Sequence, residues 1–400
     1  MFEDLIVYTP MYVALFWALV LLLTKQEQNI AKFFLGIFMF AASVLYFSHA
    51  IFFTRNIDLY KIIDPLYIFA TLSVYPLYYW YIRLLTVETS FNWNNLKLLV
   101  PSLFFSLVTF ILYRFMSDEE QTNYIYGFLL GRSQMFPETL VVHMQKWTYI
   151  ACRLVFAVQV VYYLIHGRRL VMQYHSQIAN FYSNLDSKSL LWVNFILYSF
   201  VFASFMGLIL NLIGRNAFFD SRYLLLIPSF LFSIFLFLTG FSGFIQNHTV
   251  AELDRDKNTF VPAVSRKSTP GNLERRLVEL FSEGKIYREH ELKITDVSQL
   301  LGTNRTYVSE LINDNFSCSF IEFVNKFRLE EAIKLINENQ GASIQEVAEQ
   351  AGFGSTGTFI RVFKNHVGVT PGKYRDNPVA SAGGSHGVGY GIDAVQKTVK

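Results

Sequence analysis

The chain has 400 residues, and its 34 Lys and Arg against 31 Asp and Glu give a net charge of +3 at pH 7. Charged residues make up only 16% of it, whereas soluble domains average about 25%. The shortage lies in residues 1–250, which hold 15 basic and 12 acidic residues, while residues 251–376 hold 17 and 18. This composition excludes a chain that is soluble throughout, and it predicts a lipid-facing part followed by an ordinary soluble domain.

Seven apolar runs follow one another through the first part of the chain. About 20 helical residues cross the ~30 Å of bilayer hydrocarbon, and each run is of that order. The runs are 5–23, 32–53, 62–85, 96–116, 147–165, 191–213 and 223–245. The first could be a signal peptide, but Glu3 and Asp4 precede it and no Lys or Arg does, so we predict that it spans. Seven spans place the two termini on opposite sides of the membrane.

Four ionisable side chains lie in or near these runs: His49, Asp64, Arg83 and Arg153. Arg153 comes six residues after Trp147, roughly 9 Å into its helix, where a charge is costly unless it faces the bundle or water. Arg153 and His49 are therefore our candidates for binding a polar or anionic signal. The alternative for Arg153 is structural, because its guanidinium can also snorkel to the interface or pair with Asp64 or a backbone carbonyl.

The connections between the runs carry less information. Residues 117–146 form the longest outer connection and predict either an interfacial turn or a lid. Residues 166–190 form the longest inner one and predict either a helix lying on the membrane or a docking surface. Residues 246–271 predict a linker. Residues 377–400 are rich in Gly and lack an apolar period, so we expect a disordered tail.

A first helix-turn-helix pattern occupies residues 294–312. Asp296 is a candidate cap for a short helix, Gly302 permits a tight turn, and Thr303 is a candidate cap for a second helix. Helical spacing then places three apolar side chains on the inner face of that second helix. They are Val308, Leu311 and Ile312.

A second pattern of the same kind occupies residues 343–368. Ser343 with Glu346 three residues later forms a capping box, and Gly352 turns the chain. The inner face of the helix that follows consists of Phe359, Val362 and Phe363. Between the two patterns, residues 320–336 show helical periodicity over a length of ~25 Å. Such a helix can hold two recognition helices about one DNA turn apart, ~34 Å, in successive major grooves.

Several short motifs in this region recur in one order. They are Arg328-Leu329-x-x-Ala332, Ile344-x-x-Val347-Ala348, Gly352-Phe353, Phe359-x-x-x-Phe363-Lys364 and Gly368-x-Thr370-Pro371-x-x-Tyr374-Arg375. On these residues, the stretch 292–375 resembles the DNA-binding domain of AraC/XylS-type transcription regulators. Two positions depart from that pattern: Ser298 replaces a usual Ala, and Gly357 stands where a polar recognition-helix residue is usual. The resemblance implies sequence-specific binding to double-stranded operator DNA, and it covers a fifth of the chain.

The outward faces of the two second helices give the candidate DNA contacts. They are Arg305, Thr306, Ser309 and Glu310 in the first pattern, and Thr356, Ile360, Arg361 and Lys364 in the second. Arg361 can bond guanine O6 and N7 at once, with a phosphate contact as the alternative, and Lys364 is better placed for phosphate. Glu310 can accept from cytosine N4, or else it makes no contact with DNA. The positive charge of residues 351–375, which contain no acidic residue, predicts that the second pattern anchors on phosphates.

These features together predict an all-α protein. A seven-helix transmembrane sensor (residues 1–245) and the linker 246–271 precede a soluble domain of two helix-turn-helix units joined by a central helix (272–376), with the tail 377–400 last. Since DNA is cytoplasmic in a bacterium, we expect a multi-pass protein of the inner membrane with its N-terminus outside and its C-terminal domain in the cytoplasm. Expected partners are operator DNA, membrane lipid, a second copy of the chain, RNA polymerase and an unknown signal ligand.

Two other classes of protein fit the composition. A transporter or channel with an attached regulatory DNA-binding domain would show intramembrane acidic or amide pairs and inverted repeats. Asn194 and Asn211 are present, but the sequence has no visible repeat. A membrane enzyme would need a cluster of His, Asp or Glu at one depth. The sequence contains no metal-ligand spacing, phosphate loop or nucleophile–base motif, so we expect no catalytic residues, metal or cofactor.

Overall fold

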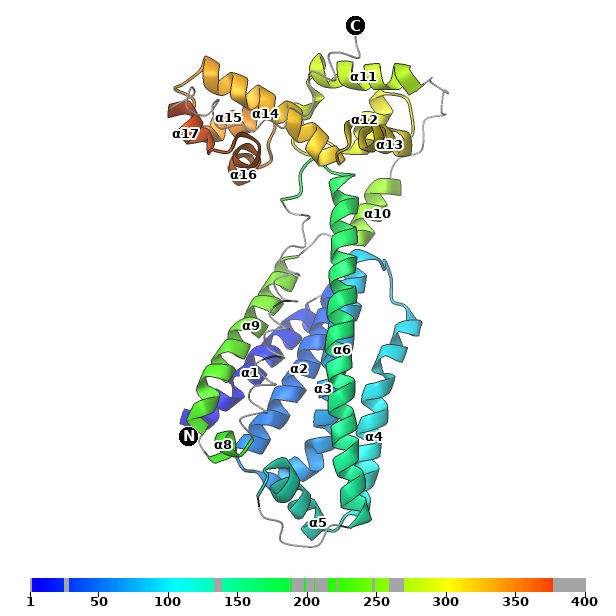
Figure 1. Cartoon of the computed structure of the whole chain (residues 1–400), viewed down its shortest axis with the longest axis vertical. Helices are drawn as coiled ribbons and strands as arrows, with labels where there is room; N and C mark the ends of the chain where they lie inside the picture. The colour runs from blue at the N-terminus through cyan, green and yellow to red at the C-terminus, as the bar shows by residue number, and fades with distance from the viewer. Residues whose placement is uncertain are drawn as a thin grey trace. The chain divides into compact units, whose positions relative to one another are not determined.

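The computed structural model of the chain is helical (Figure 1). It describes residues 2–24, 29–132, 139–186, 188, 198, 205, 215–220, 222–246, 249–258 and 270–376. Every regular element among these residues is a helix, and an isolated antiparallel bridge joins Tyr182 to Lys293. The prediction of an all-α fold is confirmed for this part of the chain. The tail 377–400 lies outside it, as does the sixth apolar run, 191–213, apart from Tyr198 and Phe205.

The chain divides into two compact units. The first consists of Met1–Gln173 and Leu190–Ala251, and the second consists of Tyr174–Ser189 and Glu252–Lys400. Neither unit is one continuous stretch of sequence, because a short segment in the middle of the chain belongs to the unit that contains the helix-turn-helix patterns. The domain boundaries that we placed at residues 245, 271 and 376 stay predictions.

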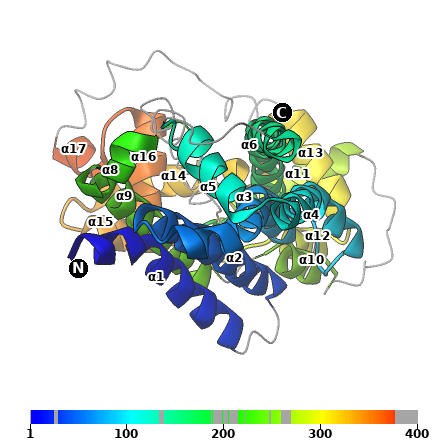
Figure 2. The same cartoon turned by 90° about the horizontal axis from the view of Figure 1, so that it is seen from below.

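The first unit is a bundle of long helices. They are α1 (Phe2–Leu23), α2 (Ile30–Phe53), α3 (Ile57–Thr86), α4 (Val100–Phe115), α6 (Leu140–Ala179) and α9 (Leu226–Ile245). Shorter elements connect them: η1 (Trp93–Leu99), α5 (Asp118–Asn123), η2 (Tyr124–Leu129), α8 (Arg215–Asp220) and η3 (Arg222–Leu225). α2 packs against both α1 and α3, α9 packs against α1, and α4 packs against α3 (Figures 1 and 2). Tyr75 and Tyr79 of α3 contact Phe156 and Tyr163 of α6.

Five helical stretches of the described chain are long and apolar enough to cross a membrane. They are Leu5–Leu23, Ile30–Phe53, Trp93–Phe115, Leu140–Ala179 and Tyr223–Asn258. The predicted run 62–85 lies within α3, which is not among the five although it has 30 residues. Its tyrosines, its Pro65 and Pro76, and Trp80 lower its mean hydropathy. The count of seven spans therefore stays a prediction.

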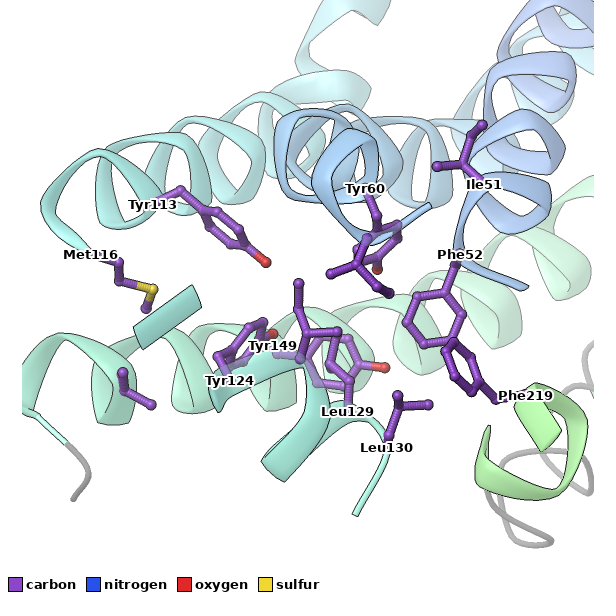
Figure 3. Close-up of a cluster of buried hydrophobic side chains, with 13 residues drawn as sticks. Ile51, Phe52, Tyr60, Tyr113, Met116, Tyr124, Leu129, Leu130, Tyr149 and Phe219 are labelled. Atoms are coloured by element: carbon purple, nitrogen blue, oxygen red, sulfur yellow. The ribbon is translucent and has the colours of Figure 1, made fainter. Parts of the chain in front are cut away.

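A buried aromatic cluster closes one end of this bundle (Figure 3). Tyr60 of α3, Tyr113 of α4, Tyr124 of η2 and Tyr149 of α6 converge there, and Phe52 of α2 meets Phe219 of α8 at 5.7 Å between ring centroids. Tyr124, Ile125 and Leu129 belong to the connection 117–146, for which we predicted an interfacial turn or a lid. Their side chains are buried, so this part of the connection is packed into the bundle.

The second unit contains the helix-turn-helix patterns. Its helices are α10 (Val250–Asn258, from Glu252), α11 (Pro270–Ser282), η4 (Ile286–Arg288), α12 (Ile294–Leu300), α13 (Arg305–Phe316), α14 (Phe320–Glu338), α15 (Ile344–Gln350), α16 (Thr356–Val367) and α17 (Pro371–Asp376). α12 and α13 form the first predicted pattern, and α15 and α16 form the second. The central helix begins at the predicted residue and runs two residues further than predicted.

The caps of these helices are partly those that the sequence predicts. The capping box of Ser343 and Glu346 at α15 is confirmed, with the Ser343 amide donating to Glu346 Oε2 over 2.7 Å. At α12 the cap is Lys293, and Asp296 lies three residues later, where its carboxylate accepts from the Lys293 amide at 2.8 Å. At α13 the cap is Asn304, whose side chain accepts from the Thr306 amide at 3.1 Å, while Thr303 is buried. The predictions of Asp296 and Thr303 as caps are therefore wrong.

Both turn glycines adopt the left-handed conformation, with φ of +62° at Gly302 and +90° at Gly352. We predict that Gly302→Ala destabilises the second unit by about 1–2 kcal/mol, because an alanine is strained in the left-handed conformation. No steric clash adds to this cost, since a Cβ at this position meets no atom within 4 Å. Gly352→Ala should cost about 3 kcal/mol or more, because its Cβ would also lie 2.5 Å from the Tyr287 carbonyl oxygen and 2.6 Å from Arg288 Cα.

The thiol of Cys318, which is half-buried and free, reports unfolding of this unit. In a Cys152→Ala background, the temperature at which Cys318 becomes reactive should fall more in Gly352→Ala than in Gly302→Ala. Equal falls would contradict the backbone clash at Gly352.

Candidate DNA interface

The first helix-turn-helix unit separates its apolar and polar side chains as predicted. Val308 and Ile312 of α13 are fully buried, and Leu311 is half-buried. The opposite face exposes Thr306 and Glu310, and Arg305 and Ser309 are half-buried at its edges. Tyr307, which is not among the predicted contacts, has a side chain that is 56% exposed on the same helix. An exposed tyrosine beside two polar positions extends the surface that α13 can offer to DNA.

The second helix-turn-helix unit, α15 and α16, is built around aromatic contacts. Phe359 and Phe363 of α16 are fully buried and meet edge to face, and they also contact Phe353 and Tyr374. The other face exposes Ile360, Arg361 and Lys364, with Thr356 half-buried in the first turn. Four of the eight predicted contact residues thus lie on one face of α16. Their roles toward DNA stay predictions.

Not all of the positive charge of the second helix-turn-helix unit and of α17 after it is available to DNA. Arg361, Lys364 and Lys373 are exposed. Arg375, however, donates to the Ala342 carbonyl oxygen over 3.2 Å and lies 3.6 Å from Asp376. Arg375 therefore ties α17 to the turn before α15, and the exposed cations Arg361, Lys364 and Lys373 are those that remain for phosphates.

α14 joins the two helix-turn-helix units. It packs against α13 on one side and against α15 and α16 on the other, and its 19 residues extend roughly 28 Å. Arg328 lies in the middle of this helix and is only 1% exposed. Its Nε donates to the Tyr287 carbonyl oxygen at 2.7 Å and its Nη2 to the Glu289 carbonyl oxygen at 2.7 Å. Burial lowers the pKa of Arg328 to about 10, so the guanidinium remains charged at neutral pH.

Glu331, one turn after Arg328, forms a second polar contact between α14 and η4. Its carboxylate accepts from the Tyr287 hydroxyl at 3.2 Å and from Lys285 Nζ at 3.4 Å, and it pairs with Arg288. Burial alone would raise the pKa of Glu331, but Arg288, Lys285 and Tyr287 together hold it below its usual value. Burial in turn raises the pKa of Tyr287 to about 12. These contacts fix η4, which leads into α12, against the central helix.

A segment from the middle of the chain contributes to this unit, in a role that the sequence does not indicate. Ser183 accepts from Arg328 Nη1 through its carbonyl oxygen at 2.9 Å and from Nη2 through its hydroxyl at 3.1 Å. The Ser183 amide donates to the Leu292 carbonyl oxygen, and the Ile294 amide donates to the Phe181 carbonyl oxygen, both at 3.0 Å. Of the two alternatives for residues 166–190, the docking surface fits the end of this connection, while α6 continues as a helix to Ala179.

The two candidate signal-binding residues of the first unit lie in different surroundings. His49 is half-buried, with its Nε2 3.3 Å from the Tyr67 hydroxyl and with Tyr46 and Phe53 beside its ring. Arg153 is exposed among the described residues and lies over the Tyr149 ring at 5.3 Å. Asp64, which we considered as its partner, is buried and accepts from the hydroxyls of Tyr60 and Tyr113 at 2.7 and 2.9 Å. No ligand role is assigned by these contacts, and both residues stay candidates.

No group of three or more His, Cys, Asp or Glu in the described ranges could hold a metal ion.

Comparison with known proteins bears on the second unit. Residues 297–377 match the family model described as "Helix-turn-helix domain". Over 95 residues, 24% of this chain, the sequence is 35% identical to the probable transcription factor PqrA of Proteus vulgaris and covers 77% of that protein. The chain belongs to the AraC-type helix-turn-helix transcription regulators. The protein is accordingly a transcriptional regulator with a helix-turn-helix DNA-binding domain at its C-terminal end.

Other relatives share only this part. The Msm operon regulatory protein of Streptococcus mutans is 29% identical over 84 residues, which are 21% of this chain and 30% of that protein. The regulator YtdP of Bacillus subtilis is 32% identical over 87 residues, 22% of this chain and 11% of that protein. In solved structures, the C-terminal domain of AraT, a response regulator from Geobacillus stearothermophilus, is 27% identical and covers 32% of this chain and 100% of that one. Its TM-score of 0.25 is too low to bear on the fold.

We predict that Glu331→Gln destabilises the second unit at pH 7 by about 1.5–3 kcal/mol, because it removes a charged acceptor from three donors. The folded pKa of Glu331 is lowered, so its contribution is fully present above the unfolded pKa of about 4.3 and is lost as pH falls through the folded value. The thermal unfolding midpoints of the two proteins, followed by the loss of helical circular dichroism, should therefore converge as pH falls below about 4. A gap that is unchanged across this pH range would show that the carboxylate charge is not what stabilises the contact.

Proposed function

We propose that the chain is a membrane-tethered, sequence-specific transcription regulator that couples a signal at its first unit to promoter binding by its second. The observation that supports this is the combination, in one chain, of five helices able to cross a membrane and an AraC-type helix-turn-helix domain. The first unit would lie in the bacterial inner membrane with the N-terminus outside. The second unit would lie in the cytoplasm, where the DNA is.

The recognition helices of this proposal are α13 and α16. The exposed guanidinium of Arg361 would bond O6 and N7 of a guanine, and Ile360, 37% exposed beside it, would contact a thymine methyl group. Lys364, one turn later, would contact a phosphate. On α13, Arg305, Thr306 and Ser309 would face the other groove, and Glu310 would accept from cytosine N4.

Both recognition helices pack on α14, so this helix would fix their separation and orientation. Helix-turn-helix units held by a fixed linking helix can read two major grooves on one face of the duplex. A homodimer and RNA polymerase stay the predicted protein partners. The signal ligand stays unidentified, with His49 and Arg153 as the candidate residues for binding it.

The roles of Arg361 and Lys364 can be separated by operator variants. Arg361→Ala should weaken binding by about 1–3 kcal/mol and relax specificity at one base pair, because it removes a base contact. Lys364→Ala should weaken all sequences alike and reduce the slope of log affinity against log salt by about one, because it removes a phosphate contact. The measurement is binding of each variant to single-base operator variants at several salt concentrations.

Lys334→Ala is the matched control, since Lys334 is an exposed lysine on α14 outside both recognition helices, and its affinity and salt slope should stay unchanged. If Arg361→Ala weakens every operator variant equally, Arg361 is a phosphate contact and its assignment as a base reader is wrong. If none of the proteins prefers any sequence, the proposal of sequence-specific binding fails as a whole.

A further inference from the structure

The segment that follows α6 is built into the DNA-binding unit, and we call residues 181–186 the strap. It pairs in antiparallel fashion with the residues that lead into α12, through the bridge of Tyr182 with Lys293 and two backbone hydrogen bonds of 3.0 Å. The Tyr182 hydroxyl also donates to Asp256 Oδ2 at 2.7 Å. Both ring and backbone of Tyr182 are thus fixed, and the residue is only 1% exposed.

Arg328 anchors the strap from the inside. The guanidinium gives two of its four hydrogen bonds to Ser183 and the other two to the carbonyl oxygens of Tyr287 and Glu289. A buried guanidinium needs acceptors for its donors, and the strap supplies half of those present here. The strap is therefore part of the packing of the second unit, because the buried Arg328 uses Ser183 as an acceptor.

Beyond Ser183, the strap reaches the second helix-turn-helix unit. Asn184 Nδ2 donates to Glu291 Oε1 at 2.7 Å, and Lys188 pairs with Glu291 Oε2 at the same distance. A Cβ on Gly354, in the turn before α16, would lie 2.2 Å from Asn184 Nδ2. Asn184 therefore lies directly against the turn that positions the second recognition helix.

Asp186, the last residue of the strap, places its carboxylate beside the start of α16. Thr358 is the third residue of this helix after its cap Ser355, and its hydroxyl donates to Asp186 Oδ1 at 2.5 Å. The N-terminal part of a recognition helix contacts base edges, and helix N-termini attract phosphates. A carboxylate held at that place repels a DNA phosphate and occupies Thr358, which lies in the same turn as the predicted contact Thr356.

We propose that the strap is an autoinhibitory segment whose docking on the start of α16 competes with DNA. This inference rests on the proposed binding of DNA by α16. The strap follows α6, a helix that begins at Leu140 in the first unit and whose residues from Tyr174 belong to the second. A signal that alters α6 changes the position of the strap, and release of Asp186 from Thr358 opens α16 to DNA. A ligand achieves this only through its different affinity for the two states of the strap.

The first test removes the charge and keeps the shape. A pool of fluorescent duplexes is first enriched for binding to the full-length Asp186→Asn protein, and affinities of the full-length proteins in detergent are then measured with that pool. Asp186→Asn should bind roughly five- to tenfold more tightly than the parent chain. Glu349→Gln removes the same charge from the exposed face of α15 and should leave affinity unchanged. An unchanged affinity of Asp186→Asn, or an equal gain in Glu349→Gln, overturns the proposal.

The second test locks the strap in place. The Cβ built on Gly354 lies 2.7 Å from Asn184 Cγ, so cysteines at the two positions have their Cβ atoms no farther apart than about 4.2 Å, within disulfide range. In a Cys152→Ala, Cys318→Ala background, the oxidised Asn184→Cys, Gly354→Cys protein should bind the duplex pool at least tenfold more weakly than its reduced form. The Asn184→Cys protein alone should not respond to oxidation.

The outcomes distinguish the two proposals. A protein with a verified disulfide that binds equally well oxidised and reduced overturns the autoinhibition, because the strap then does not compete with DNA. If no duplex is enriched by any of the proteins, locked or released, the proposed DNA binding fails instead.

Discussion

The buried guanidinium of Arg328 is the interaction on which the second unit depends. It lies in the middle of α14 and donates to three stretches of backbone: the strap at Ser183, η4 at Tyr287, and the residue after η4 at Glu289. A charge this deep is stable only while its donors are satisfied, so the position of α14 fixes the position of the other segments. Because α14 also carries both helix-turn-helix units, one side chain relates the reading helices to the segment that follows α6.

This arrangement gives the chain a physical route from the first unit to the second. The helix-turn-helix domain alone would be joined to the bundle only through the residues after α9. The strap adds a second connection, which continues from α6 and ends at the start of α16. In the proposed membrane topology, the two stretches that form the second unit would also have to emerge on the same side of the membrane. The residues between them would then cross the membrane an even number of times, as they would if the predicted runs 191–213 and 223–245 both span it.

The helix-turn-helix units could be predicted from the sequence because their signals are local. Phe359 and Phe363 follow helical spacing, and Gly302 and Gly352 mark turns that other residues adopt only under strain. The caps were harder to predict. Asn304 and Thr303 are adjacent and are both residue types that favour caps, while Asp296 bonds the Lys293 amide from three residues further along the helix. The strap could not be predicted, because Arg328 binds Ser183 across 145 positions in the sequence. Three of the four acceptors of Arg328 are also backbone carbonyl oxygens, which leave no mark on the sequence. The exposure of Arg153 could not be predicted either, because a helix that is apolar all round has no periodicity that shows which side faces the bundle.

In the proposed topology, both stretches of the second unit lie in the cytoplasm and the connection that contains Gly131 lies outside. Reporter fusions that truncate the chain after Gly131, His175 and Gln246 test it directly, with one reporter active only outside and another active only inside. We expect an outside position for Gly131 and an inside position for both His175 and Gln246. Opposite positions for His175 and Gln246, or an outside position for Gln246, would contradict it, because the strap could not then fold with a DNA-binding domain in the cytoplasm.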